Sequence, residues 1–268
     1  MSKTYFAPVL DPDREEITLA YMHDGAQDRE DGPTGLFWLG GFMSDMEGSK
    51  ASLLATLAKA QNRPALRFDY SGHGQSGGKF VDGTISKWLD ETSQMFLDHT
   101  IGKRIIVGSS MGGWLATLLY KNIAENHRDQ LHRIAGLVLI APALDMTKDL
   151  MWDEYDEIIR QEITSQGFYA EPSEYGNEPY IITKDLIDDG KQHCLLQTGL
   201  KVDCPVRVLQ GEADPDVPWQ HGLKVYDALE GSDVVFSLIK HGDHRLSSFD
   251  NLRLIENTCT QLLDIADI

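Results

Sequence analysis

The stretch IIVGSSMGGWLATLL, residues 105–119, joins an apolar run to a helical pattern through a turn of glycine and serine. Gly108, Ser110 and Gly112 give the spacing GxSxG, and glycines on either side of a serine remove side chains that would collide at a tight strand-to-helix turn. Such a turn presents the serine hydroxyl at the carboxyl edge of a sheet, near the positive end of the following helix. We therefore predict that Ser110 is a nucleophile; the alternative is a turn that only joins strand and helix.

Outward from this turn, apolar β-rich runs alternate with helical patterns, which predicts an α/β fold with a mostly parallel central sheet flanked by helices. The expected strands are residues 16–22, 35–41, 65–70, 104–109, 135–141, 206–211 and 234–240, in a sheet of about eight strands. Helical spacing covers residues 50–61, 85–97, 112–126, 222–229 and 252–266.

One segment breaks the alternation. We predict a core in two parts, residues 1–143 and 205–268, with a lid insertion at residues 144–204 that opens with an amphipathic helix near Leu150 to Ile163. The insertion has 14 Asp and Glu against 5 Lys and Arg, a net charge of −9, so its rim is acidic. Its apolar side chains either shelter a fatty-acyl or aromatic group or pack on the core; they are Leu150, Met151, Trp152, Tyr155, Phe168 and Tyr169.

Composition narrows the classes of protein. The 268 residues are 41% hydrophobic, enough for a sizeable core, and no apolar run approaches the roughly 20 residues that span a bilayer. The net charge of −18 opposes binding to nucleic acid or to anionic lipid, so we expect neither as a partner and no stable membrane association. The opening residues resemble neither a signal peptide nor a transit peptide, and the three cysteines form no CxxC pair. We expect a cytoplasmic protein.

A serine hydroxyl needs a base, which this topology places on a loop after the last strand. His241 and His244 both follow that strand, and we favour His244, because the GxH turn swings its ring over the sheet edge. A metal site at His241, Asp243 and His244 is the weaker interpretation, since no other His/Cys cluster completes a coordination shell. We therefore expect no metal.

The third group should be a carboxylate after the preceding strand, where it fixes the imidazole tautomer. Residues 209–219, LQGEADPDVPW, offer Glu212, Asp214 and Asp216. We favour Asp214, because Asp216 is close enough to the next helix to act as its cap, and the choice between the two stays open.

An oxyanion formed by the serine needs two backbone donors. We assign them to the amide of Met111, directly after Ser110, and to the amide of Phe42, after Gly40 and Gly41 at the end of a strand. The alternative is that the two glycines only form a turn.

Residues 68–78, FDYSGHGQSGG, contain GxGxxG at Gly72, Gly74 and Gly77, which is typical of a dinucleotide site only where a helix begins at the loop. Here the stretch KFVDGT separates the glycine loop from the next expected helix, so we expect no nucleotide cofactor. We expect no other cofactor either. Asp69, Ser71 and His73 are interpreted as braces for the neighbouring loops.

Taken together, GGF, FDYSGHGQSGG, VGSSMGGWL, GEADPDVPW and KHGDHR resemble the α/β-hydrolase superfamily over nearly the whole chain. Together with Trp88, Asp90 and the HCLL of residues 193–196, they most resemble the family of α/β-hydrolase domain-containing protein 10. The resemblance implies the α/β-hydrolase fold, the triad order Ser110, Asp214, His244, and cleavage of palmitoyl thioesters on proteins or of acyl glucuronides.

The resulting hypothesis is a serine hydrolase that acts on small-molecule esters or acylated proteins through an acyl-enzyme. The alternatives are a small-molecule carboxylesterase, a C–C bond hydrolase or perhydrolase on the same fold, and a binding protein without activity. The preferred acyl chain and the oligomeric state stay open.

Overall fold

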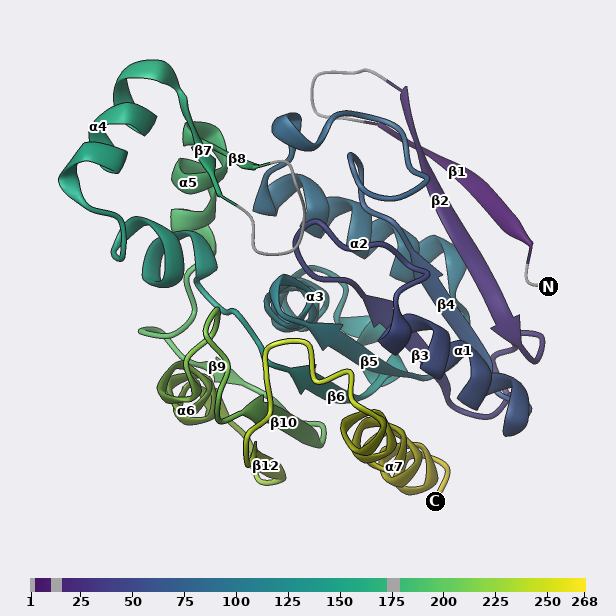
Figure 1. The fold of residues 1–268 in the computed structure, drawn as a ribbon. Helices are drawn as coiled ribbons and strands as arrows, with labels where there is room; N and C mark the ends of the chain where they lie inside the picture. Colours follow the sequence, from purple (N-terminus) through teal and green to yellow (C-terminus); the bar gives the residue numbers. More distant parts are fainter. Residues whose placement is uncertain (1–2, 11–15, 173–178) are drawn as a thin grey trace.

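A computed structural model of the chain describes residues 3–10, 16–172 and 179–268. Its centre is an eight-stranded sheet with the order β1-β2-β4-β3-β5-β6-β10-β12 (Figure 1). The pairs β1/β2 and β2/β4 are antiparallel, and the other pairs are parallel. The strands of this sheet are β1 (Thr4–Leu10), β2 (Glu16–Gly25), β3 (Gly35–Leu39), β4 (Pro64–Phe68), β5 (Arg104–Ser109), β6 (Ile134–Ile140), β10 (Val206–Gly211) and β12 (Val234–Ile239).

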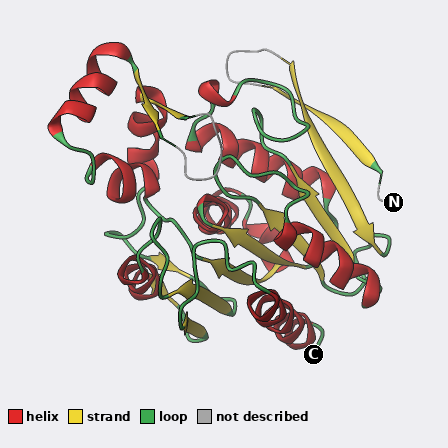
Figure 2. Ribbon diagram, in the orientation of Figure 1, coloured by secondary structure: helices red, strands yellow, loops and turns green. Residues whose placement is uncertain are grey.

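Helices cover both faces of the sheet (Figure 2). The longer ones are α1 (Ser49–Ala60), α2 (Ile85–His99), α3 (Met111–Asn126), α6 (Trp219–Ala228) and α7 (Phe249–Ala266). Short turns η1 (Phe80–Asp82) and η2 (Arg128–Arg133) and a small pair of strands, β9 (Leu200–Lys201) with β11 (Leu229–Glu230), complete the core. Among the described residues, no helix has the length and apolar character needed to cross a membrane.

The alternation of side chains along each strand divides the core into two layers. On β3, Phe37 and Leu39 pack with α2 and α3, whereas Leu36 and Trp38 pack with α1 and α7. The central strands β3, β5 and β6 are therefore covered on both faces and are mostly apolar, whereas Val235 and Leu238 of the edge strand β12 stay 44% and 45% exposed. The α/β fold with a mostly parallel sheet of about eight strands is confirmed, and each of the seven expected strands is present.

The first strand, β1, is not among the strands expected from the sequence. Its sequence TYFAPVL contains Pro8, which lowers the strand signal because proline cannot donate a ladder hydrogen bond. β1 lies at the edge of the sheet and pairs only with β2, so the missing donor can face away from the sheet. An edge position explains how this strand tolerates proline.

Between β6 and β10 the chain forms a separate group of elements at the upper left of Figure 1. They are the π-helical turn η3 (Met146–Trp152), α4 (Glu157–Gln166), β7 (Phe168–Glu171), β8 (Tyr180–Thr183), α5 (Lys184–Gly190) and η4 (Lys191–His193). The prediction of a single helix near Leu150 to Ile163 is wrong. The segment forms two elements, η3 and α4, because Asp156 caps the start of α4 by accepting from the amide of Ile159 at 2.9 Å. Residues 173–178 of the predicted insertion lie outside the described residues.

The apolar side chains singled out in this segment mostly pack inward. Met151 and Tyr155 are buried in the larger core cluster, and Leu150, Trp152 and Tyr169 pack against it. Phe168 alone of the six is exposed, at 41%. Packing on the core, the second of the two interpretations, therefore accounts for five of them.

Two isoleucines provide a matched test of this core. Ile106 is fully buried in β5, and Ile158 in α4 is 75% exposed. We expect Ile106→Ala to lower the free energy of unfolding by about 2–5 kcal/mol, because it leaves a cavity in a packed layer. Ile158→Ala should change it by less than about 0.5 kcal/mol. Urea unfolding of both variants measures the difference, and equal losses would contradict the layer assignment.

Candidate active site

Ser110 lies at the junction of β5 and α3 with φ 55° and ψ −120°, a backbone conformation that residues other than glycine rarely adopt. Its amide donates to the carbonyl of Ile140 at 2.9 Å, which ties the turn to the end of β6. A Cβ on Gly108 would lie 2.1 Å from the carbonyl oxygen of Gly112, and one on Gly112 would lie 2.1 Å from that of Leu39. The two glycines are therefore required by close backbone packing, and Ser110 is left partly exposed at the sheet edge.

The structure brings Ser110, His244 and Asp214 together in one hydrogen-bonded chain. His244 Nε2 lies 3.1 Å from Ser110 Oγ, and His244 Nδ1 lies 2.8 Å from Asp214 Oδ2. A carboxylate can only accept, so Nδ1 carries the proton and Nε2 is free to accept from the serine hydroxyl. This is the tautomer that a general base requires.

Asp214 is held by its own loop. Its side chain is fully buried, and Oδ1 accepts from the amides of Asp216 at 3.0 Å and Val217 at 2.8 Å. Gln210 donates to Oδ2 at 3.2 Å, so the carboxylate has a fixed orientation. Asp216 is exposed, although its carboxylate lies within 4.8 Å of the ligand atoms of Asp214 and His244. Of the two aspartates, Asp214 is the buried one, and its Oδ2 lies 2.8 Å from His244 Nδ1.

The other histidine considered, His241, lies beside Glu212 at the surface. Its side chain is 83% exposed, and its backbone amide donates to Glu212 at 3.2 Å. Glu212, the third carboxylate considered, also pairs with Lys240, so it contributes to the outer end of the loop. Neither His241 nor Glu212 reaches Ser110 in the hydrogen-bonded chain.

The loop that carries His244 is fastened to the start of α1. Lys50 Nζ donates to the carbonyl of Arg245, and Ser49 Oγ bonds to Ser247 Oγ at 3.1 Å. Burial lowers the pKa of Lys50 to about 8. These contacts hold the loop that carries His244 against the start of α1, which directly follows the loop after β3.

The two residues expected to supply the oxyanion donors, Met111 and Phe42, belong to segments next to Ser110. Met111 is the first residue of α3, where amides have no partner within the helix. The loop after β3 approaches from the other side: a Cβ on Gly41 would lie 3.3 Å from Ser110 Cβ. Phe42 follows directly, and its ring packs edge-on against Phe80 at 4.7 Å between centroids.

The glycine loop GxGxxG is followed first by the short turn η1. The next long helix, α2, begins at Ile85 rather than at Gly77, whereas a dinucleotide loop of this kind opens directly into a helix. Asp69 and His73 from this loop accept from the amides of Met46 at 2.6 Å and Met43 at 3.3 Å. The interpretation of Asp69 and His73 as braces is confirmed for these contacts.

A profile of the family described as "Serine aminopeptidase, S33" matches residues 42–166. The palmitoyl-protein thioesterase ABHD10, mitochondrial, of Pongo abelii is 33% identical over 231 residues, which cover 86% of this chain and 73% of that protein. The mouse protein of the same name is 33% identical over 261 residues, covering 94% of this chain and 84% of that one. The chain belongs to the ABHD10 family of α/β-hydrolases.

Solved structures agree with this assignment. A putative hydrolase from Agrobacterium vitis S4 is 39% identical with a TM-score of 0.91, covering 98% of this chain and 99% of that one. Mouse α/β-hydrolase domain-containing protein 10 is 31% identical with a TM-score of 0.82, covering 97% and 98%. This ABHD10-family protein is therefore a hydrolase on the α/β-hydrolase fold.

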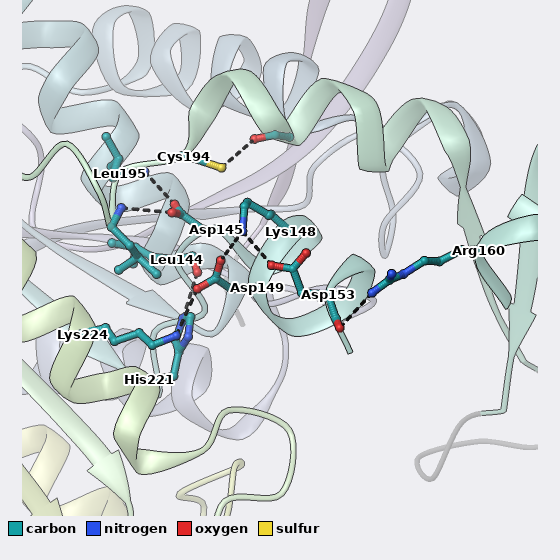
Figure 3. A network of polar contacts seen from close by, with 12 residues as sticks. Leu144, Asp145, Lys148, Asp149, Asp153, Arg160, Cys194, Leu195, His221 and Lys224 are labelled. Atoms are coloured by element: carbon teal, nitrogen blue, oxygen red, sulfur yellow. Dashed lines mark hydrogen bonds and ion pairs between the residues drawn. The ribbon is translucent and has the colours of Figure 1, made fainter. Parts of the chain in front are cut away.

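In this family member, the start of the segment between β6 and β10 is bonded both to the end of the same segment and to α6 (Figure 3). The buried carboxylate of Asp145 accepts from the amides of Leu195 at 2.7 Å and Leu196 at 3.0 Å. His221 of α6 lies 2.9 Å from the carbonyl of Leu144. The start of the segment is thus held by a polar network. The sequence gives no signal for this network, because Asp145 and Leu195 are 50 positions apart and Leu144 and His221 are 77 apart.

The buried imidazole of His73 predicts a pH dependence of stability in this ABHD10-family protein. Burial lowers its pKa from 6.5 to about 4, so between these values the unfolded chain binds a proton that the folded chain does not. Stability is therefore complete above pH 6.5 and falls as the pH drops toward 4, by about 2 kcal/mol at pH 5 from this group. Urea unfolding at pH 7.5 and 5 should show a smaller loss in His73→Gln than in wild type. Identical losses in both proteins would exclude His73 as a source.

Proposed function

We propose that this protein is a serine hydrolase of carboxylic esters and thioesters in which Ser110, His244 and Asp214 form the catalytic triad. The observation that carries the proposal is the chain from Ser110 Oγ through both nitrogens of His244 to Asp214, with contacts of 3.1 and 2.8 Å. It ends on a serine in the strained turn between a buried strand and a helix, which is the geometry of a nucleophile elbow.

The reaction proceeds through an acyl-enzyme. Ser110 Oγ attacks the carbonyl carbon while His244 Nε2 takes its proton, and Asp214 stabilises the imidazolium. The amides of Met111 and Phe42 donate to the oxyanion. His244 then protonates the departing alcohol or thiol, and a water activated by the same imidazole releases the acid and restores Ser110.

For the substrate, we propose a palmitoyl thioester on a protein, the substrate class given by the names of the relatives. Acyl glucuronides are proposed as a second class of substrate. The relatives named palmitoyl-protein thioesterases are about one third identical to this chain, over 86% of its length or more. Thioesters and esters share the carbonyl attack, so the same triad serves both.

The two aspartates supply a matched test of the triad. Asp214→Asn should lower kcat by about 10⁴-fold, because the amide favours the wrong tautomer of His244. Asp216→Asn should stay near wild type, since Asp216 is exposed to solvent and His244 Nδ1 is bonded to the buried Asp214. Ser110→Ala should remove nearly all turnover, and circular dichroism should report an unchanged fold. Wild-type rates in Asp214→Asn with a large loss in Asp216→Asn would reverse the assignment.

The acyl preference is measured with p-nitrophenyl esters from acetate to palmitate, comparing wild type with Ser110→Ala. We expect Ser110-dependent rates that persist or rise at long chains, followed by release of palmitate from S-palmitoyl peptides. Rates confined to short chains would overturn the palmitoyl proposal and leave a small-molecule esterase.

A further inference from the structure

The loop after β4 lies against the loop after β3 and bonds to it at several points. Tyr70 donates to the carbonyl of Gly40 at 3.3 Å, at one end of the loop. At the other end, Asp69 accepts from the amide of Met46 at 2.6 Å. Arg67 adds a donation to the Met46 carbonyl, also at 2.6 Å. The span of residues 40–46, which contains Phe42, is thus fixed at both ends.

The middle of the span is a turn in which the amide of Ser44 donates to the carbonyl of Gly41 at 3.1 Å, and the loop after β4 adds a hydrogen bond to the amide of Met43 within that turn. Met43 has φ 58°, a left-handed conformation that costs energy for a residue with a side chain and persists only where surrounding contacts hold it. Its amide donates to His73 Nε2 at 3.3 Å. Because Met43 directly follows Phe42, the direction of this amide fixes the peptide plane next to the one that carries the Phe42 N–H.

His73 is itself held as a rigid acceptor. Since Nε2 accepts from Met43, the proton is on Nδ1, which donates to the carbonyl of Ser71 at 3.1 Å. The ring is 4% exposed and packs against Tyr70, Phe80 and Trp88 at 5.2–5.4 Å between centroids. The same burial lowers its pKa to about 4, which keeps the imidazole neutral at physiological pH.

We propose that His73 is a positioning residue for the reaction: by accepting from the Met43 amide it holds the Phe42 N–H where the oxyanion forms. His73 does not touch the reacting atoms, and it acts through the backbone of residues 42 and 43. The inference rests on the proposed serine-hydrolase function and adds to it the element that orients the second oxyanion donor.

Two amide substitutions separate the two hydrogen bonds of His73. Glutamine can place its side-chain oxygen near the position of Nε2 and keep an acceptor for Met43, whereas asparagine is one methylene shorter and reaches only the Ser71 side. Both are neutral and polar, so they are matched in burial cost. We expect His73→Gln to keep kcat within about 5-fold of wild type and His73→Asn to lower it about 10- to 100-fold, less than complete loss of an oxyanion donor.

For each variant, kcat and KM are measured on one p-nitrophenyl ester, and kcat is expressed per active site, counted by titration with a fluorophosphonate. The melting temperature of each variant is measured as well. KM should change little, because the contact acts on the transition state. Binding of a trifluoromethyl ketone, which forms an oxyanion on Ser110, should weaken in His73→Asn in proportion to the loss of kcat/KM, while binding of the product acid should not. A purely structural role would lower the melting temperatures without this split.

Wild-type kcat in His73→Asn, or equal losses of kcat in both variants, would overturn the inference. Ser110→Ala in the same assay tests the proposed function separately. Turnover that survives this substitution would refute the proposed triad itself, whereas the His73 variants test only the positioning role of His73. If neither His73 variant folds, amide hydrogen exchange in the wild type decides: slow exchange at Met43 supports the contact, and exchange at the rate of an exposed loop refutes it.

Discussion

Ser110 can occupy its position only because the backbone around it is over-determined. A non-glycine residue at φ 55° costs about 1–3 kcal/mol, and the structure must offset this cost locally. The amide of Ser110 donates to Ile140, and its carbonyl accepts from Gly113 at 2.9 Å and Ala143 at 3.1 Å. The turn is therefore locked to the end of β6 as well as to α3. The end of β3 and the loop after it also pack closely against this turn, and a Cβ at Gly112 would prevent that packing because it would lie 2.1 Å from the carbonyl oxygen of Leu39.

The parallel sheet converts this local constraint into a site. Carboxyl ends of parallel strands meet at one edge, so loops after β3, β5, β10 and β12 converge although they are far apart in the chain. Ser110 and His244 are 134 positions apart, and Asp214 and His244 are 30 apart, and each pair is within hydrogen-bond distance. The residues proposed for the chemistry lie in the turns and loops that follow these strands, and the sheet register brings those loops together.

This division explains what the sequence could predict. Strands buried on both faces give clear apolar runs, and Ser110, Asp214 and His244 each follow the end of a strand, so the fold and the grouping of these three residues could be deduced. The strand with Pro8 and the break before Asp156 could not, because each depends on a neighbour: an open sheet edge in one case, a helix cap in the other. Asp145 also gave no signal, since its partners at Leu195 and Leu196 are amides and carry no side-chain pattern.

Phe42 links the segment between β6 and β10 to the proposed chemistry. Its amide is one of the two proposed oxyanion donors, and its ring lies edge-on to Tyr180 of β8 at 6.1 Å between centroids. The ring also contacts Trp88, which donates to the carbonyl of Ser71, the same carbonyl that fixes His73. The ring and the amide belong to one residue in a loop held by Met43 and Met46. The contact of the Phe42 ring with β8 and the hydrogen bonds that hold its loop therefore belong to one connected group of residues, so a displacement of β8 would act on the proposed donor amide.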